Sequence, residues 1–146
     1  MLTFARVGAA LLYGLVAWYV GTLIQPLYVE ERPIPYVPVW NAFFGAIVGW
    51  RIAGAQAGKG LSASVGSGTT TTLALVVVCL FAHSFAEMIR LAMRLSYDGP
   101  VEAVVDIATI MYDHAQTIAT QEIIVTAIVG GLLAAALTEL VAGRYD

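Results

Sequence analysis

Long apolar runs are the feature that most constrains how this chain can fold. Residues 3–24 and 121–142 are mainly apolar over about 20 positions, the length that a helix needs to cross a bilayer. A run at about 70–94 is similar, whereas the apolar run that begins at Val39 is short and is expected to cross, over about 39–56, only by continuing past Arg51. Hydrophobic residues make up 60% of the 146 positions and charged residues 12%, against about 45–50% and 25% in soluble domains. So small a soluble domain could not bury this surface, and we expect one membrane domain over residues 1–146.

The predicted fold is an all-α integral membrane protein, a helical bundle with four transmembrane helices at about 3–24, 39–56, 70–94 and 121–142. Residues 25–38 hold four of the five prolines and predict a Pro-rich surface loop, because proline removes a backbone donor. The Gly/Ser-rich segment 54–68 predicts a second loop. Asp98–Gly99–Pro100 is expected to end the third span and to start another helix.

A fifth helix, amphipathic rather than uniformly apolar, is expected over residues 100–118. Glu102, Asp106 and Asp113 fall on one polar stripe together with Thr109 and Gln116. Three lone carboxylates at the bilayer centre would cost about 2.5–3.5 kcal/mol each. This cost favours a helix that lies in the membrane interface. The alternative is a fifth spanning helix whose polar face lines a wet bundle interior.

Ionisable residues gather near the end of the third span. His83, Glu87, Arg90 and Arg94 share one helix face through their spacing of 4, 3 and 4, and Asp98 follows. Ionisable residues within membrane helices are functional hypotheses by default. These five are the candidate binding site, as a proton relay, an anion or quinone site, or a lipid headgroup site. The structural alternative is a helix end that reaches the interface, where Glu87 neutralises Arg90.

Small residues four positions apart suggest where helices pack closely. Gly45 and Gly49 form one such pair, and Gly131 and Ala135 form another. The close contact is expected within the bundle or at an interface with a second copy or a partner. Asn41, one turn before Gly45, could form a hydrogen bond across such a contact.

Two further polar features have structural interpretations. Glu139, near the end of the last span, is expected to pair with Arg51 or Arg144. Residues 58–60, Gly-Lys-Gly, do not match a phosphate loop, which needs Ser or Thr after its lysine. Most tyrosines and tryptophans, Tyr28 included, fall near predicted span ends and indicate an aromatic belt.

The sequence contains few residues that could form a disulfide, hold a metal or cofactor, or catalyse a reaction. Cys79 is the single cysteine, so neither an intrachain disulfide nor a cysteine metal cage can form. His83 and His114 could hold at most one haem b, but His114 is expected near the surface beside the polar stripe rather than facing His83. We therefore predict no cofactor, no metal site, no catalytic residues and no enzyme activity. Seven basic residues are too few and too scattered for binding nucleic acid.

Several blocks between residues 41 and 140 resemble the TrgA family, in the order expected of that family. They are Asn41–Ala42, Gly49–Trp50–Arg51, Gly54, Ala57–Gly58–Lys59–Gly60, Glu87–Arg94, Tyr97–Asp98–Gly99–Pro100, Glu102–Ala103, Gly130–Gly131 and Leu137–Thr138–Glu139. The resemblance implies a small inner-membrane protein of alphaproteobacteria that is associated with tellurite resistance. It carries over no catalytic residues. Lys59 departs from the pattern, where arginine is expected.

The expected function is that of a non-enzymatic, multi-pass bacterial inner-membrane protein associated with tellurite or membrane-stress resistance. It would bind a partner, lipid or anion, with the bilayer, other membrane proteins or a second copy around it. The first alternative is an accessory subunit of a photosynthetic or respiratory complex, and the second is a haem- or quinone-linked redox subunit. Basic residues near the span ends favour cytoplasmic N- and C-termini. In that orientation Arg6, Arg51, Lys59 and Arg144 lie inside, and Arg32, Arg90 and Arg94 lie outside.

Overall fold

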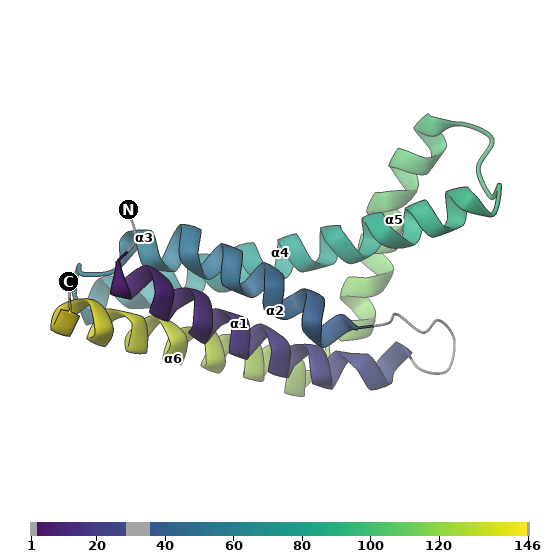
Figure 1. Cartoon of the computed structure of the whole chain (residues 1–146). Coiled ribbons are helices and arrows are strands. Elements are labelled where there is room, and N and C mark those ends of the chain that lie inside the picture. The colour runs from purple at the N-terminus through teal and green to yellow at the C-terminus, as the bar shows by residue number, and fades with distance from the viewer. Residues whose placement is uncertain (1–2, 29–35, 146) are drawn as a thin grey trace.

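The computed structural model describes residues 3–28 and 36–145, and all regular secondary structure in these ranges is helical (Figure 1). The helices are α1 (Phe4–Ile24), the 3-10 turn η1 (Gln25–Tyr28), α2 (Val37–Val48), the π-helical turn η2 (Gly49–Ala53), α3 (Gly54–Gln56), α4 (Leu61–Met93), α5 (Pro100–Ile118) and α6 (Gln121–Tyr145). The all-helical fold class is confirmed.

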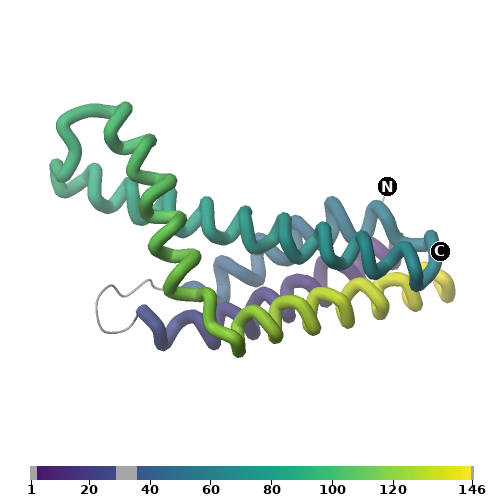
Figure 2. The backbone as a smooth tube through the Cα atoms, turned by 180° about the vertical axis from the view of Figure 1, so that it is seen from behind, coloured from purple at the N-terminus to yellow at the C-terminus, as the bar shows by residue number. Residues whose placement is uncertain are grey.

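The helices form an elongated bundle from which one arm extends. α1 packs against α2 and α6, and α6 packs against α4. Both termini lie at one end of the bundle, beside α3 (Figure 1). At the other end α4 continues past its neighbours, and α5 returns along it obliquely (Figure 2). We call residues 84–118, the last part of α4 together with α5, the α4–α5 arm.

Three helical segments are long and apolar enough to cross a membrane: Phe4–Tyr28, Leu61–Met93 and Gln121–Tyr145. Large apolar side chains such as Leu11, Leu73 and Leu133 stand exposed on their outer faces, as expected of helices that lipid surrounds. Three of the four predicted spans are therefore supported by length and composition. The remaining one, 39–56, is divided among α2, η2 and α3.

Glycines bring α2 into backbone contact with α1. A Cβ atom on Gly45 would lie 2.5 Å from the Tyr13 carbonyl oxygen, and one on Gly49 would lie 2.5 Å from that of Ala9. The next glycine, Gly54, lies five residues on rather than four. The Gly54 amide donates to the Gly49 carbonyl, the i to i+5 bond of a π turn, and this extra residue returns Gly54 to the face that meets α1.

α4 and α6 approach through small residues too. A Cβ atom on Gly68 would lie 2.7 Å from the Ala135 Cβ, and one on Gly131 would overlap the Thr72 hydroxyl. Both glycine-containing pairs noted in the sequence, Gly45 with Gly49 and Gly131 with Ala135, therefore lie in contacts within the chain.

The predicted Gly/Ser-rich loop over 54–68 is wrong in its second half, because α4 begins at Leu61. The hydroxyls of Ser64 and Thr71 donate to backbone carbonyls of the preceding turn, to Leu61 at 2.7 Å and to Ser67 at 2.6 Å. These bonds satisfy the polar side chains inside the helix, and the small size of serine and threonine permits the contact with α6. Of the predicted Pro-rich loop, residues 25–28 form η1, residues 29–35 lie outside the described ranges, and α2 begins at Val37.

α4 ends before the predicted Asp98–Gly99–Pro100 signal. The Leu95 amide donates to the Ala92 carbonyl and the Ser96 amide to the Leu91 carbonyl, both at 3.0–3.3 Å, which is the Schellman arrangement. Leu95 has φ of +54°, the left-handed conformation that usually selects glycine. Gly99 and Pro100 then act as the N-cap and first residue of α5, which covers the expected range.

Candidate functional site: an interhelical cavity

A cavity of about 90 Å³ lies between α1, α4 and α6, where the ends of α2 and α5 also reach it. α4 lines it from Thr72 to His83, a length of about 16 Å along the helix. The lining is mainly apolar, and the described lining residues include no Asp, Glu, Lys or Arg. Val76 in the wall is 37% exposed, so the cavity opens to the outer surface of the bundle. A site of this kind can hold the polar head and first carbons of a chain that continues into lipid.

Uncharged polar side chains from four elements meet at one end of the cavity. His83 Nε2 lies 2.8 Å from Asn41 Oδ1, which joins α4 to α2. Because an amide oxygen can only accept a hydrogen bond, this contact places a proton on His83 Nε2. The His114 ring lies 5.3 Å from the Tyr28 ring, and the buried Tyr28 hydroxyl makes no hydrogen bond to a described residue.

The position of His114 contradicts the expectation that it lies near the surface, away from His83. It is 7% exposed and lines the same cavity as His83. The reason is a packed face of α5, separate from the polar stripe. It is formed by Ala103, Ile107, Ile110 and His114 at spacings of 4, 3 and 4. Ala103, Ile107 and Ile110 belong to the apolar cluster around Met88 of α4. This face directs the end of α5 back over the bundle.

The other end of the cavity is closed by a hydrogen bond between distant helices. The fully buried Tyr13 hydroxyl donates to the Gly131 carbonyl at 3.0 Å. Cys79 lies in the wall between the two ends. The described residues contain no group of three His, Cys, Asp or Glu side chains that could hold a metal ion.

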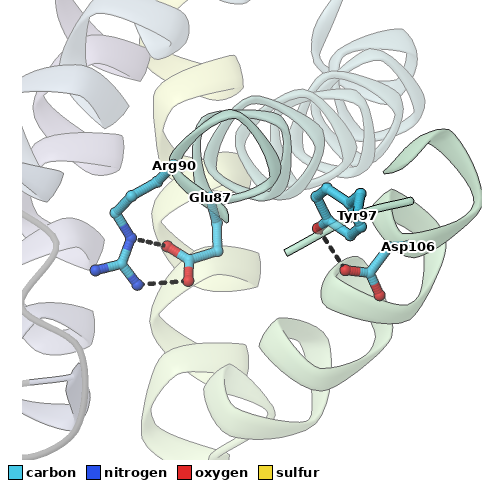
Figure 3. A network of polar contacts seen from close by, with 4 residues as sticks. All are labelled: Glu87, Arg90, Tyr97 and Asp106. Atoms are coloured by element: carbon cyan, nitrogen blue, oxygen red, sulfur yellow. Dashed lines mark hydrogen bonds and ion pairs between the residues drawn. The ribbon is translucent and has the colours of Figure 1, made fainter. Parts of the chain in front are cut away.

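The five predicted binding residues do not form one site. His83 faces the cavity. Arg90 donates from Nε and Nη2 to the two Glu87 oxygens, at 2.8 and 2.6 Å (Figure 3). Arg94 and Asp98 stand exposed beyond this ion pair. The bidentate pair corresponds to the structural alternative, in which Glu87 neutralises Arg90.

A second polar contact ties the α4–α5 connection to α5. The Tyr97 hydroxyl donates to Asp106 Oδ2 at 2.6 Å (Figure 3). This bond holds the proton on the phenol and raises the pKa of Tyr97 to about 12, with smaller contributions from desolvation and from the negative charges of Asp106, Glu87 and Glu102. The rest of the polar stripe, Glu102 and Asp113, is exposed.

Glu139 does not form the ion pair expected with Arg51 or Arg144. Its two carboxylate oxygens accept hydrogen bonds from the backbone amides of Gly58, at 2.8 Å, and of Gly60. These glycines have φ of +87° and +94°, so the turn presents successive amides to one anion. The Gly-Lys-Gly segment thus binds a carboxylate of its own chain. We call this contact the Glu139 clasp.

Comparisons of the chain with protein-family models, with curated proteins and with solved structures gave no match. The resemblance to the TrgA family stays a prediction that rests on the sequence blocks.

Sequence reasoning did not find the polar end of the cavity. Tyr28 was assigned to the aromatic belt, and Asn41 to helix packing. The spacing of Ala103, Ile107, Ile110 and His114 was the available signal, because it predicts a packed face on α5.

Proposed function

We propose that this chain is a non-enzymatic multi-pass membrane protein that binds a membrane-dissolved amphiphile in the interhelical cavity. The observation that carries the proposal is an apolar cavity with one polar end, built around the 2.8 Å contact between His83 and Asn41. Small-molecule sites in proteins are usually concave and apolar with a few placed polar groups. The cavity replaces the Arg90 and Arg94 face as the binding site, since Glu87 neutralises Arg90.

The proposed topology has four spans. α2, η2 and α3 together cover residues 37–56, about 30 Å of helix, which matches the hydrocarbon thickness. Gly45, Gly49 and Gly54 keep this segment against α1 from end to end. Four passes also agree with the two termini at one end of the bundle (Figure 1).

The distribution of basic residues supports an orientation in which the end that holds both termini faces the cytoplasm of a bacterium. Arg6, Arg51, Lys59 and Arg144 belong to elements at the end that holds both termini, whereas the arm carries Arg90 and Arg94 among the described residues. Basic residues near span ends favour the cytoplasmic side, which makes the inner membrane the proposed location.

α5 is proposed to lie in the outer interface of this membrane. Beside its polar stripe runs an exposed apolar stripe that includes Val101, Val104, Val105 and Tyr112, each at least 63% exposed. An interfacial helix directs such faces to the acyl chains and to water.

The biological setting is proposed from the sequence resemblance alone, as tellurite or membrane-stress resistance. A second candidate, an accessory subunit of a larger membrane complex, is favoured by the apolar tip of the arm, where Met93 is 81% and Leu95 92% exposed. Native mass measurement after mild extraction tests it, and a chain that runs alone contradicts it. Haem b is not proposed, because His83 Nε2 is already bonded to Asn41.

The cavity proposal is tested with purified protein in nanodiscs and two tritiated amphiphiles, hexadecanol and palmitate, in a scintillation proximity assay. Wild type is expected to bind at least one of them saturably. Ala127→Phe, which fills the cavity wall, should abolish this binding, and the matched control Ile128→Phe, on the exposed neighbouring face, should keep it. Binding of neither probe, or equal binding by both variants, would overturn the proposal.

A further inference from the structure

The cavity's polar end differs from a typical anion or cation site in the groups that it presents. An imidazole, an amide, a phenol and a second imidazole converge there, from His83, Asn41, Tyr28 and His114. Each of these groups can donate or accept a hydrogen bond while uncharged. No side chain of fixed charge stands among the described lining residues.

The nearest charged pair does not change this balance. Glu87 lies one turn beyond His83, and both of its oxygens are bonded to Arg90. Since the pair has no net charge, an anionic head would meet no uncompensated cation at the cavity end. Burying an unpaired carboxylate, phosphate or ammonium against apolar walls is costly, whereas a hydroxyl or carbonyl needs only hydrogen bonds.

The position of the polar end fits a lipid head. It lies beside the cluster of Ile24, Val37 and Ile123, at the end of α1 and near the starts of α2 and α6. That is the depth at which lipid heads meet the membrane interface, and the apolar walls continue from there towards the Tyr13–Gly131 bond in the middle of the bundle.

Resting on the proposed function, we infer that the ligand is a single-chain lipid with an uncharged, hydrogen-bonding head. Its hydroxyl or carbonyl binds among His83, Asn41, His114 and Tyr28, and its chain lies along α4 towards Thr72. The buried Tyr28 hydroxyl, which lies near the Thr117 side chain but forms no hydrogen bond of normal geometry with a described residue, then donates to the head. A long-chain alcohol and a prenylquinone share this chemistry.

The test compares heads on one tail in the nanodisc assay. Tritiated hexadecanol should bind at least about tenfold more tightly than tritiated palmitate at neutral pH, because the palmitate carboxylate would be buried without a cation to pair with it. Unlabelled geranylgeraniol and a short-chain prenylquinone serve as competitors. Their relative potency distinguishes the alcohol from the quinone source.

Two variants assign the head to the polar end. Asn41→Leu and His114→Phe should each weaken hexadecanol binding about tenfold while the cavity walls persist, and monodisperse elution with an unchanged helical spectrum shows that they fold. Gln116→Leu, exposed on α5 two residues from His114, is the matched control and should bind as wild type.

The two proposals fail differently. If palmitate binds as tightly as hexadecanol and Ala127→Phe abolishes both, the cavity site stands and the uncharged head is overturned. The uncharged head is also overturned if Asn41→Leu and His114→Phe both fold and bind hexadecanol as wild type does. If neither probe binds to wild type, the proposed function fails, and this inference fails with it.

Discussion

The two ends of the bundle differ in what lies between their helices. From the end that holds both termini to the middle of the bundle, helices touch through glycine and other small residues, and the backbones of α1 and α2 meet at Gly45 and Gly49. At the other end Gly21 also packs against Pro38, but polar side chains such as His83 and His114 face a shared space between helices.

The difference follows from what holds helices together in lipid. Lipid tails are as apolar as leucine, so helix association depends on close packing and on hydrogen bonds rather than on the removal of apolar surface from water. The glycine-rich end supplies the close packing. The opposite end can then keep a cavity without losing the bundle, which makes it the part of the molecule suited to binding.

The largest expected effect comes from breaking the packed end. In Gly45→Val the new Cβ would lie 2.5 Å from the Tyr13 carbonyl oxygen and 2.7 Å from the Ala17 Cβ. Both neighbours belong to a rigid helix, so we expect a loss of about 3 kcal/mol in unfolding free energy, at the upper end of overpacking costs. Thermal unfolding followed by circular dichroism in detergent measures it.

Gly66→Val is the matched control, because a Cβ there meets no atom within 4 Å. It should cost only what valine costs relative to glycine in a helix, which is close to zero or favourable. Equal destabilisation by the two variants would show that the packed end owes its stability to something other than backbone contact.

Next in size is the Glu139 clasp, which joins α6 to the turn between α3 and α4. Glu139→Gln removes the charge from two hydrogen bonds, and bonds to charged groups are worth about 1.5–3 kcal/mol each. We expect a loss of about 2 kcal/mol and faster tryptic cleavage after Lys59, within the released turn. Glu122→Gln, exposed at the start of α6, should change neither.

The same measurement decides between the clasp and an ion pair. Arg144→Gln should leave unfolding and cleavage unchanged, because the Glu139 oxygens bond to Gly58 and Gly60. A loss as large as that of Glu139→Gln would mean that the arginine holds the carboxylate.

A pH titration tests the connection between α4 and α5 in the arm. The hydrogen bond to Asp106 raises the pKa of Tyr97 from its ordinary value of 10.0 to about 12. Its contribution to stability is therefore complete below pH 10 and is lost as the pH rises towards 12. Near-ultraviolet absorbance of tyrosinate should show one fewer late-titrating phenol in Tyr97→Phe than in wild type.

In Asp106→Asn one phenol, the same one that Tyr97→Phe removes, should move back towards pH 10, whereas Asp113→Asn, exposed on the same stripe, should leave it in place. If Asp106→Asn keeps as many late-titrating phenols as wild type, the hydrogen bond between Tyr97 and Asp106 is contradicted.

The smallest expected effect is a gain in the local stability of the helix at the tip of the arm. Leu95 occupies a left-handed conformation that costs a residue with a Cβ about 1–2 kcal/mol. Leu95→Gly should slow hydrogen exchange in the last turn of α4, with little change in the bundle. Ser96→Gly, beside it but without positive φ, should speed exchange or leave it unchanged; a gain equal to that of Leu95→Gly would exclude relief of backbone strain as the cause.

Much of the fold could be predicted from the sequence, because a helix that crosses a bilayer needs about 20 mainly apolar residues. Apolar runs located α1, α4 and α6, and the polar stripe of Glu102, Asp106 and Asp113 located α5. Glycine spacing indicated close helix contacts. The start of α4 was predicted as a loop because Ser64 and Ser67 satisfy their hydroxyls inside the helix, which composition does not reveal.

The candidate site could not be assembled from local patterns. Its polar end joins residues 28, 41, 83 and 114, each on a different element, and their meeting depends on the direction in which α5 returns. The partner of Glu139 was missed for a related reason. Every residue except proline has a backbone amide, so the sequence does not show which amides in a turn will bind a carboxylate. The nearby arginines were therefore the expected partners of Glu139, rather than the glycines that bind it.

The hydrogen bonds that Tyr13 and Gly58 donate to α6 have a consequence for biosynthesis. Tyr13 bonds to Gly131 and Gly58 to Glu139, across 118 and 81 positions of chain. When α1 to α5 have entered the membrane during synthesis, the Tyr13 hydroxyl and the amide of Gly58 therefore still lack their partners on α6. Insertion of each span can precede assembly, but these hydrogen bonds form only after α6 arrives.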